Sequence, residues 1–279
     1  MNLKLYLYIL HIVASIMSVI QEIISLDYSR IIQQIQAYIR DKVINSKKSG
    51  VVLGLSGGLD STVAAFLAKY ALGKDRVLAL IMPDRRITPA QDIEDAKEVA
   101  DMLSIEYRII DIEPIHRAFM ENLEEDRLAE GNLRARIRMC LLYYHANLLN
   151  RLVMGTGDRS EILIGYFTKY GDGGIDFNPI GCLFKTQVRE LARVIGVPER
   201  IINKKSSPRL WLDQTAEGEI GLTYEVIDSI LYLVFDKGLA KEEVAKRIGV
   251  SLGDVTRVLK MYEETQHKRA PPDVCYLRF

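Results

Sequence analysis

Four short apolar runs alternate with stretches of helical spacing, and this alternation constrains the fold more than any other feature of the sequence. The runs are Val51–Leu55, Val77–Met82, Tyr107–Ile112 and Leu152–Gly155. The helical stretches between them are Asp60–Ala71, Pro89–Leu103 and Asn132–Leu149. Buried strands separated by helices predict a doubly wound, mostly parallel open sheet with helices on both faces, of the Rossmann-like kind. Ligands bind such sheets at the carboxyl ends of the strands, so the following loops should form the site.

The later part of the chain is predicted to be helical. Its candidate helices are Lys185–Ile195, Tyr224–Phe235, Lys241–Ile248 and Ser251–Thr265. The last two have helix-turn-helix spacing around Gly249, which raises the question of DNA binding. The second of them carries Arg257 and Lys260 but also acidic residues, so it lacks the basic stripe of a DNA-reading helix. We therefore expect ordinary helix packing and no nucleic-acid partner.

The charge balance and the cysteines narrow the class of protein. The 37 Lys and Arg residues equal the 37 Asp and Glu residues, so no overall field attracts nucleic acid or an anionic membrane. The cysteines, Cys140, Cys182 and Cys275, are far apart and form no Cys-x-x-Cys pair. This pattern favours a reducing, cytoplasmic location over a disulfide framework or a zinc site. Cys140 lies in an apolar helical pattern, and we expect it in the core.

The N-terminal segment is apolar from Leu5 to Ile20. This run is short for a membrane-spanning helix, and no signal-peptide cleavage pattern follows it. We divide the chain into an N-terminal extension, residues 1–22, and a single domain, residues 23–279. Residues 1–16 are expected to be dispensable, either as an unused upstream start or as a loosely held helix.

The strongest local signal is the run Gly54-Leu55-Ser56-Gly57-Gly58-Leu59-Asp60-Ser61, which follows a predicted strand and opens a helix. Glycines, hydroxyl groups and the amino end of a helix together form a site for phosphate. The run lacks the lysine of a Walker loop, on which transfer of a γ-phosphate relies. It carries Asp60 instead, and a carboxylate beside phosphates implies a Mg²⁺ ion between them.

This loop resembles that of the pyrophosphatase-loop ATP enzymes. The resemblance implies cleavage of ATP between its α and β phosphates, adenylation of an acceptor oxygen and release of pyrophosphate. The group includes NAD synthetase, GMP synthetase, asparagine and argininosuccinate synthetases and tRNA-thiolating enzymes. The loop alone does not separate them.

Two later regions should reach the same crevice. In Gly131–Met139, Arg134 and Arg138 share one helix face while Arg136 points elsewhere, toward a mostly apolar side. A guanidinium on that side needs either an anionic ligand or an internal salt bridge if buried. The run Gly155–Asp176 follows a predicted strand and is glycine-rich and charged, as an ordered binding loop would be. Within it, Glu161 would provide a second carboxylate for the metal ion.

The order and spacing of six segments resemble the NAD synthetase family from about Ile32 to Pro272. These segments are Gly54–Ser61, Gly131–Met139, Gly155–Asp176, Phe184–Gln187, Leu210–Thr215 with Glu217, and His267–Pro271. The resemblance implies a sheet of the adenine nucleotide alpha hydrolase type and amidation of deamido-NAD by ammonia, the last step of NAD biosynthesis. The family commonly has Pro-Ser-Ala where this chain has Ser206–Arg209, and Gly-Gln-Thr-Asp-Glu where it has Asp213–Glu217.

Transferred by position, the resemblance assigns the following roles. ATP would contact the loop Gly54–Ser61, Thr156, Lys185 and Ser207. Mg²⁺ would be held by Asp60 and Glu161. Deamido-NAD would contact Arg136, Lys169, Asp176, His267 and Lys268. Beyond these transferred contacts, we take Asp60, Lys185 and Asp176 as catalytic residues, with Lys185 aiding the pyrophosphate and Asp176 as the candidate base for ammonia.

The resemblance also implies a reaction and its partners. The nicotinate carboxylate of deamido-NAD would attack the α-phosphorus of ATP, and ammonia would then displace AMP from the acyl-adenylate. The chain has no room for a glutamine amidase domain, so free ammonia or a separate ammonia-supplying protein is expected, and so is a homodimer. Two alternatives remain: a GMP-synthetase-like adenylating amidase, and a nucleotide-binding regulator that reads DNA with its C-terminal helix pair.

Overall fold

A four-stranded parallel sheet lies at the centre of the computed structural model, which describes residues 3–277, with side chains from residue 10 onward. Its strands are β1 (Val51–Gly54), β2 (Val77–Ile81), β3 (Glu106–Ile109) and β4 (Leu152–Val153). Their order in the sheet is β3-β2-β1-β4, and every pairing is parallel. Each of the four predicted strands is present, which confirms the doubly wound parallel fold.

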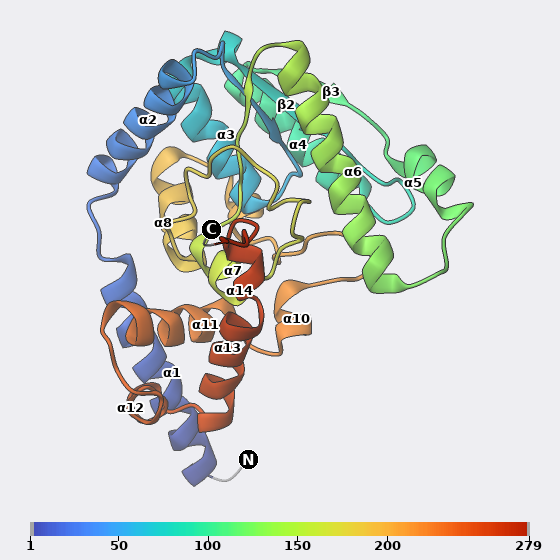
Figure 1. Cartoon of the computed structure of the whole chain (residues 1–279). Coiled ribbons are helices and arrows are strands. Elements are labelled where there is room, and N and C mark those ends of the chain that lie inside the picture. Colours follow the sequence, from blue (N-terminus) through green and yellow to red (C-terminus); the bar gives the residue numbers. More distant parts are fainter. Residues whose placement is uncertain (1–2, 278–279) are drawn as a thin grey trace.

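The two faces of the sheet bury different helices because strand side chains alternate in direction. Val52, Leu78 and Val153 face α6 (Arg127–Leu148) on one side, with α5 (Glu113–Met120) at its edge. Val51, Leu53 and Ala79 face the other side. The helices packed there are α2 (Tyr28–Asn45), α3 (Leu59–Leu72), α4 (Ala90–Leu103) and α8 (Lys185–Ile195) (Figure 1).

The strand order reverses between β1 and β4, and this reversal locates the site. From β1 the chain winds outward through α3, β2 and α4 to β3, and then returns over the opposite face through α6 to β4 beside β1. The loops after β1 and β4 therefore leave toward opposite faces and open a crevice between them. The phosphate loop follows β1, and the segment from Gly155 follows β4.

A second apolar cluster joins the two ends of the chain. It contains α1 (Leu3–Ile24), α11 (Tyr224–Leu231), a π-helical turn η2 (Tyr232–Asp236), α12 (Lys241–Ile248) and α13 (Leu252–Glu264), which gather at the lower end of Figure 1. Val244 of α12 and Val255 of α13 are fully buried there, so the predicted helix-turn-helix pair packs its inner faces into this cluster. The short elements are α7 (Arg159–Ile164), α9 (Glu199–Ile202), α10 (Ala216–Ile220), α14 (Gln266–Arg269) and the 3-10 turn η1 (Lys74–Arg76).

The N-terminal segment forms one continuous helix whose two halves differ in burial. Val19 and Ile23 are buried in the second cluster, whereas Leu10 and Val13 are about half exposed, at 46% and 51%. Ile16 packs against the cluster from the side. Residues 1 and 2 of the predicted extension lie outside the described residues.

We expect deletion of residues 1–16 to leave activity intact and to improve solubility. The deletion removes exposed apolar side chains, which promote association, and keeps Val19, Ile20 and Ile23. Turnover and light scattering of the truncated and full-length proteins check this. A matched deletion that continues through Ile23 should destabilise the protein, because it empties the buried side of α1. Loss of activity in the shorter deletion would contradict the prediction and make the whole helix part of the working domain.

Membrane crossing and cysteine burial can be assessed directly. From residue 10 to residue 277, no single helical stretch is long and apolar enough to span a membrane. The segment Leu10–Ile24 together with α2 meets that criterion by length and composition alone, as a pair bent by 54°. All three cysteines are free and exposed. The expectation that Cys140 is a core residue was therefore wrong, because α6 turns that side away from the sheet.

Candidate active site

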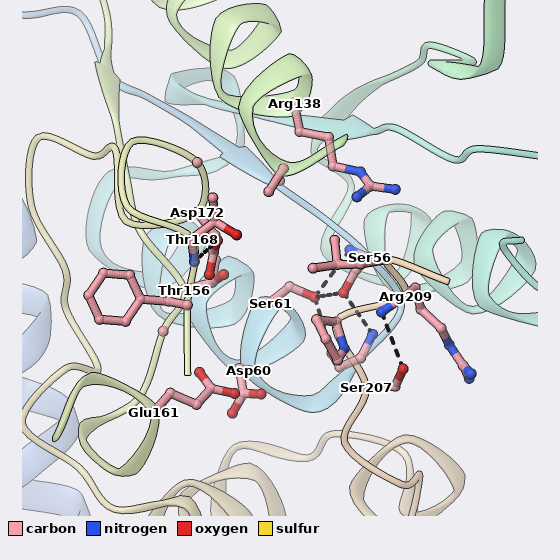
Figure 2. Close-up of a pocket in the computed structure, with 18 of the residues that line it drawn as sticks. Ser56, Asp60, Ser61, Arg138, Thr156, Glu161, Thr168, Asp172, Ser207 and Arg209 are labelled. Atoms are coloured by element: carbon pink, nitrogen blue, oxygen red, sulfur yellow. Dashed lines mark hydrogen bonds between the residues drawn. The ribbon is translucent and has the colours of Figure 1, made fainter. Parts of the chain in front are cut away.

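The phosphate loop has a shape that its own hydroxyl groups fix. The Ser56 N–H donates to Ser61 Oγ at 3.2 Å, and the two serine hydroxyls lie 3.0 Å apart. Gly57 has a φ of +74°, and a Cβ at that position would lie 2.2 Å from the Asp92 carbonyl oxygen. Only glycine fits this turn, since both the conformation and the space exclude a side chain. These contacts hold the loop open toward the cavity (Figure 2).

Three carboxylates converge beside the loop. Asp60 comes from the first turn of α3, and Asp158 and Glu161 come from the start of α7, where they form a capping box. The buried ammonium group of Lys185 lies 2.6 Å from Asp60 Oδ2, 2.6 Å from Asp158 Oδ2 and 3.0 Å from Glu161 Oε1. In Figure 2 the carboxylates of Asp60 and Glu161 point toward each other.

This acidic group is suited to a divalent cation. One ligand oxygen from each of Asp60, Asp158 and Glu161 lies within 4.8 Å of the others. With all three ionised, their charge of −3 and the +1 of Lys185 leave −2, which one Mg²⁺ would balance. Asp60 Oδ1 is buried and has no hydrogen-bond partner in the described part of the chain, so it is free to bind an ion. Asp60 and Glu161 also line the cavity.

Burial and mutual charge act on the protonation of this group. Burial, with the nearby charge of Asp158, raises the pKa of Glu161 well above its ordinary value. Burial alone would lower the pKa of Lys185, but the charges of Asp158, Asp60 and Glu161 outweigh it and raise that pKa. Lys185 therefore carries its charge, while the raised pKa values of Asp158 and Glu161 show that these two carboxylates resist ionisation. A divalent cation would relieve that repulsion.

A deeper layer of hydrogen bonds holds α7 against α8 and α11. The Ser160 hydroxyl donates to Asp228 Oδ1 at 2.5 Å and accepts the N–H of Lys185 at 2.9 Å. The Thr186 N–H donates to the other Asp228 oxygen at 2.9 Å. Burial raises the pKa of Asp228 to about 7. This layer fixes the two helix starts that carry Glu161 and Lys185.

A cavity of about 800 Å³ opens above the loop and the carboxylates. Many of the residues predicted to bind ligand line it: Gly54, Leu55, Ser56, Gly58, Leu59, Asp60, Ser61, Thr156, Glu161, Ser207 and Lys268. Among the residues that the structure describes, the predicted site residues Gly57, Lys185, Arg136, Lys169, Asp176 and His267 lie outside its lining. The cavity has room for a nucleotide together with part of a second substrate.

Three residues predicted to bind deamido-NAD are linked by hydrogen bonds, and a fourth, Lys268, follows one of them in the sequence. Arg136 Nη2 donates to the Lys169 carbonyl oxygen at 3.4 Å, and Lys169 Nζ donates to the His267 carbonyl oxygen at 2.7 Å. Lys268 Nζ donates to the carbonyl oxygens of Gly165 and Phe167 at 2.7 and 2.8 Å. Asp176 lies apart from them, where its carboxylate accepts the Val153 N–H at 2.7 Å and the Tyr143 hydroxyl at 3.2 Å.

Comparison with known proteins identifies this arrangement. The family model described as NAD synthase matches residues 31–272, which is most of the chain. The chain belongs to the NAD synthase family. This match confirms the predicted resemblance, which ran from about Ile32 to Pro272.

Individual NAD synthase relatives match along almost their full lengths. The chain is 52% identical to the NH(3)-dependent NAD(+) synthetase of Hyperthermus butylicus, over 91% of this chain and 92% of that protein. It is 50% identical to the NH(3)-dependent NAD(+) synthetase of Archaeoglobus fulgidus, over 91% and 99%.

Two solved structures of similar proteins superpose on the fold. The structure of NMN synthetase from Francisella tularensis covers 90% of this chain with a TM-score of 0.80 and 36% identity. The NH3-dependent NAD synthetase from Campylobacter jejuni, in complex with the nitrate ion, covers 90% with a TM-score of 0.76 and 35% identity. Each of these chains is covered over 100% of its own length.

The structure of this NAD synthase family member also shows two site residues that sequence reasoning missed. Asp158 belongs to the acidic group, and the Asp-x-x-Glu spacing of a capping box was the signal for it. Arg138 lines the cavity, where its Nε donates to the Met82 carbonyl oxygen at 3.0 Å and burial lowers its pKa to about 10. Its neighbour Arg134 instead forms the internal salt bridge, 2.9 Å from Asp84 Oδ2.

Proposed function

We propose that this protein is an ammonia-dependent NAD synthetase, which uses ATP to amidate deamido-NAD and releases AMP and pyrophosphate. The observation that carries the proposal is the acidic group of Asp60, Asp158 and Glu161, placed beside a phosphate loop that has no Walker lysine. Curated relatives about half identical to this chain bear the name NH(3)-dependent NAD(+) synthetase. The function rests on the site and on this kinship together.

Mg²⁺ is the cofactor in this proposal, held by Asp60 and Glu161. When bound, it would neutralise charge on the phosphates of ATP. The charge of the group, the unpartnered oxygen of Asp60 and the position of both carboxylates at the cavity wall support this choice. Lys185 lies behind them, at 2.6 Å from Asp60 and 3.0 Å from Glu161, and orients both. Its predicted contact with ATP remains a prediction.

The residues of the chain would act on ATP and deamido-NAD as follows. The N–H groups and hydroxyls of Ser56 and Ser61 would bind the phosphates, and Thr156 and Ser207 would contact the nucleotide from the facing walls. The nicotinate carboxylate would attack the α-phosphorus, forming an acyl-adenylate while the bond to pyrophosphate breaks. Ammonia would then attack the acyl carbon, AMP would leave, and one proton would pass to a base. Asp176 remains the candidate for that base.

Deamido-NAD would contact Arg136, Lys169 and His267, which the hydrogen bonds described above connect, and Lys268 next to His267. We also propose a homodimer. Residues four apart on α6 (Arg136, Cys140, Tyr144 and Leu148) form an exposed stripe beside this group. A second subunit covering the stripe would enclose the part of deamido-NAD that extends out of the cavity. Ammonia would come from solution or from a separate protein, and the free cysteines suit a cytoplasmic location.

Product analysis tests the reaction. Purified protein given ATP, Mg²⁺, ammonium and deamido-NAD should make NAD and AMP in a one-to-one ratio, with pyrophosphate as the second phosphate product. Chromatography of the nucleotides measures this, and omission of ammonium is the control. Formation of ADP instead of AMP would contradict the interpretation of the loop.

A second candidate is the same amidation on a smaller acceptor. The similar structure from Francisella tularensis is that of an NMN synthetase, so nicotinate mononucleotide is a reasonable competing substrate. The names of the curated relatives favour deamido-NAD. Comparison of kcat/KM for the two acceptors under identical ATP and ammonium decides between them, and a higher value for nicotinate mononucleotide would change the assignment.

A further inference from the structure

Lys204 joins three separate parts of the molecule through one ammonium group. Its Nζ donates to the Gly57 carbonyl oxygen at 2.8 Å, to Asp92 Oδ1 at 3.0 Å and to Asp95 Oδ2 at 2.5 Å. The two aspartates lie on α4, and their side chains are 7% and 2% exposed, whereas that of Lys204 is 19% exposed. Charged hydrogen bonds that are this well shielded from water are stronger than those on the surface.

The contact with Gly57 controls the direction of a peptide in the phosphate loop. In a planar trans peptide the C=O and the following N–H point in opposite directions. Lys204 holds the Gly57 oxygen on the α4 side, so the N–H of Gly58 is directed away from α4. Gly58 lines the cavity, and its N–H donates to Ser56 Oγ at 3.3 Å, so the direction of this peptide also holds the Ser56 hydroxyl that a phosphate would meet. If the peptide turned over, a carbonyl oxygen would face the phosphates and repel them.

The same lysine begins the segment Lys204–Gln214, which forms one wall of the cavity. Further along it, Arg209 Nε donates to the other oxygen of Asp92 at 2.8 Å. Ser207 lies between these two anchors and lines the cavity (Figure 2). The segment is therefore fastened to α4 on both sides of Ser207, and the phosphate loop rests against the same turn of α4 at Gly57.

We propose that Lys204, held by Asp92 and Asp95, is a positioning residue for ATP. It sets the Gly57–Gly58 peptide and fixes the wall that carries Ser207, without contacting the reacting atoms. The proposal rests on the proposed function, since it assigns ATP to this cavity. It predicts that loss of the ammonium group weakens ATP binding and leaves the binding of deamido-NAD nearly unchanged, because the latter's proposed contacts lie on α6, α14 and the loop at Lys169.

The test compares Lys204→Met with a matched control, Arg200→Met. Arg200 also donates to Asp95, at 3.3 Å, but it does not reach Gly57. We expect K204M to raise the KM for ATP about tenfold or more, with a much smaller change in kcat and in the KM for deamido-NAD. R200M should leave all three near wild type. K204R, which keeps the charge, should recover most of the loss.

Calorimetry with ATP alone separates this proposal from the proposed function, because it needs no turnover. Weaker ATP binding in K204M but not in R200M supports the positioning role whatever the product is. If ATP binds K204M as tightly as wild type, or if both substrates weaken equally, the role is overturned. Should K204M fail to fold, Asp95→Asn loosens Lys204 from the α4 side and should raise the KM for ATP in the same direction relative to R200M. An unchanged value in that variant would likewise overturn the proposal.

Discussion

Asp60→Asn and Glu161→Gln are each expected to reduce turnover by about a thousandfold or more while the protein remains folded. The two carboxylates come from different strand ends, lie around the same ammonium group and line the same cavity. Each substitution removes one charge and one oxygen ligand, so ATP would meet a site that no longer holds Mg²⁺ in the right place. Steady-state rates across a Mg²⁺ titration measure the effect, and circular dichroism checks the fold.

A matched control for these variants is Asp236→Asn. Asp236 lies near α7 through its salt bridge to Arg159, at 2.9 Å, and this pair is partly exposed and away from the cavity. The control changes charge by the same amount and should retain a near-normal rate. A near-normal rate in Asp60→Asn or Glu161→Gln at ordinary Mg²⁺ would show that the substituted residue is not a ligand.

Lys185→Met is expected to lower the free energy of unfolding by about 3–5 kcal/mol, as loss of one member of a buried ion-pair group typically does. Lys185 is fully buried and contacts three carboxylates, so its removal leaves Asp60, Asp158 and Glu161 to repel one another. Urea unfolding of both proteins at neutral pH measures the change.

Two further measurements sharpen the Lys185 experiment. Lys97→Met removes an exposed lysine that is paired with Glu94, and it should cause no measurable loss of stability. In K185M the repelling carboxylates should take up protons. The difference in the free energy of unfolding between K185M and wild type should therefore shrink when the pH is lowered toward the range where carboxylates are neutral. An unfolding midpoint equal to that of wild type would show that the carboxylates are not ionised together and would remove the electrostatic basis of the site.

Local patterns in the sequence were sufficient to predict the framework of the fold. Val51–Leu55 and Val77–Met82 are short apolar runs bounded by turn residues, and both became central strands within a residue of the expected ends. The helices Lys185–Ile195 and Lys241–Ile248 have the predicted bounds. These features depend on the spacing of apolar residues within a few positions, and this spacing does not depend on tertiary contacts. The position of the phosphate loop after β1 follows from the same local information.

The partners of charged side chains depended on contacts between distant segments. Arg134 and Arg138 share a helix face and cannot be distinguished by spacing, yet one forms a salt bridge with Asp84 and the other lines the cavity. Packing of α8 against α7 brings the Lys185 ammonium group to 2.6 Å from Asp60 and 3.0 Å from Glu161, a pairing that spacing alone did not predict, while its contact with ATP stays a prediction.

The sequence by itself thus determined the parallel sheet, the phosphate loop and the family. Strand and helix periods and glycine positions can be read from short segments, and the order of the motifs can be read along the chain. None of them requires knowledge of the tertiary contacts. Only the tertiary structure decided that Lys204 reaches Gly57, that Lys169 meets His267 and that α1 packs against α11. Each of these contacts joins segments about a hundred or more residues apart, and a charge or an apolar face can be satisfied by many partners until packing brings one within reach.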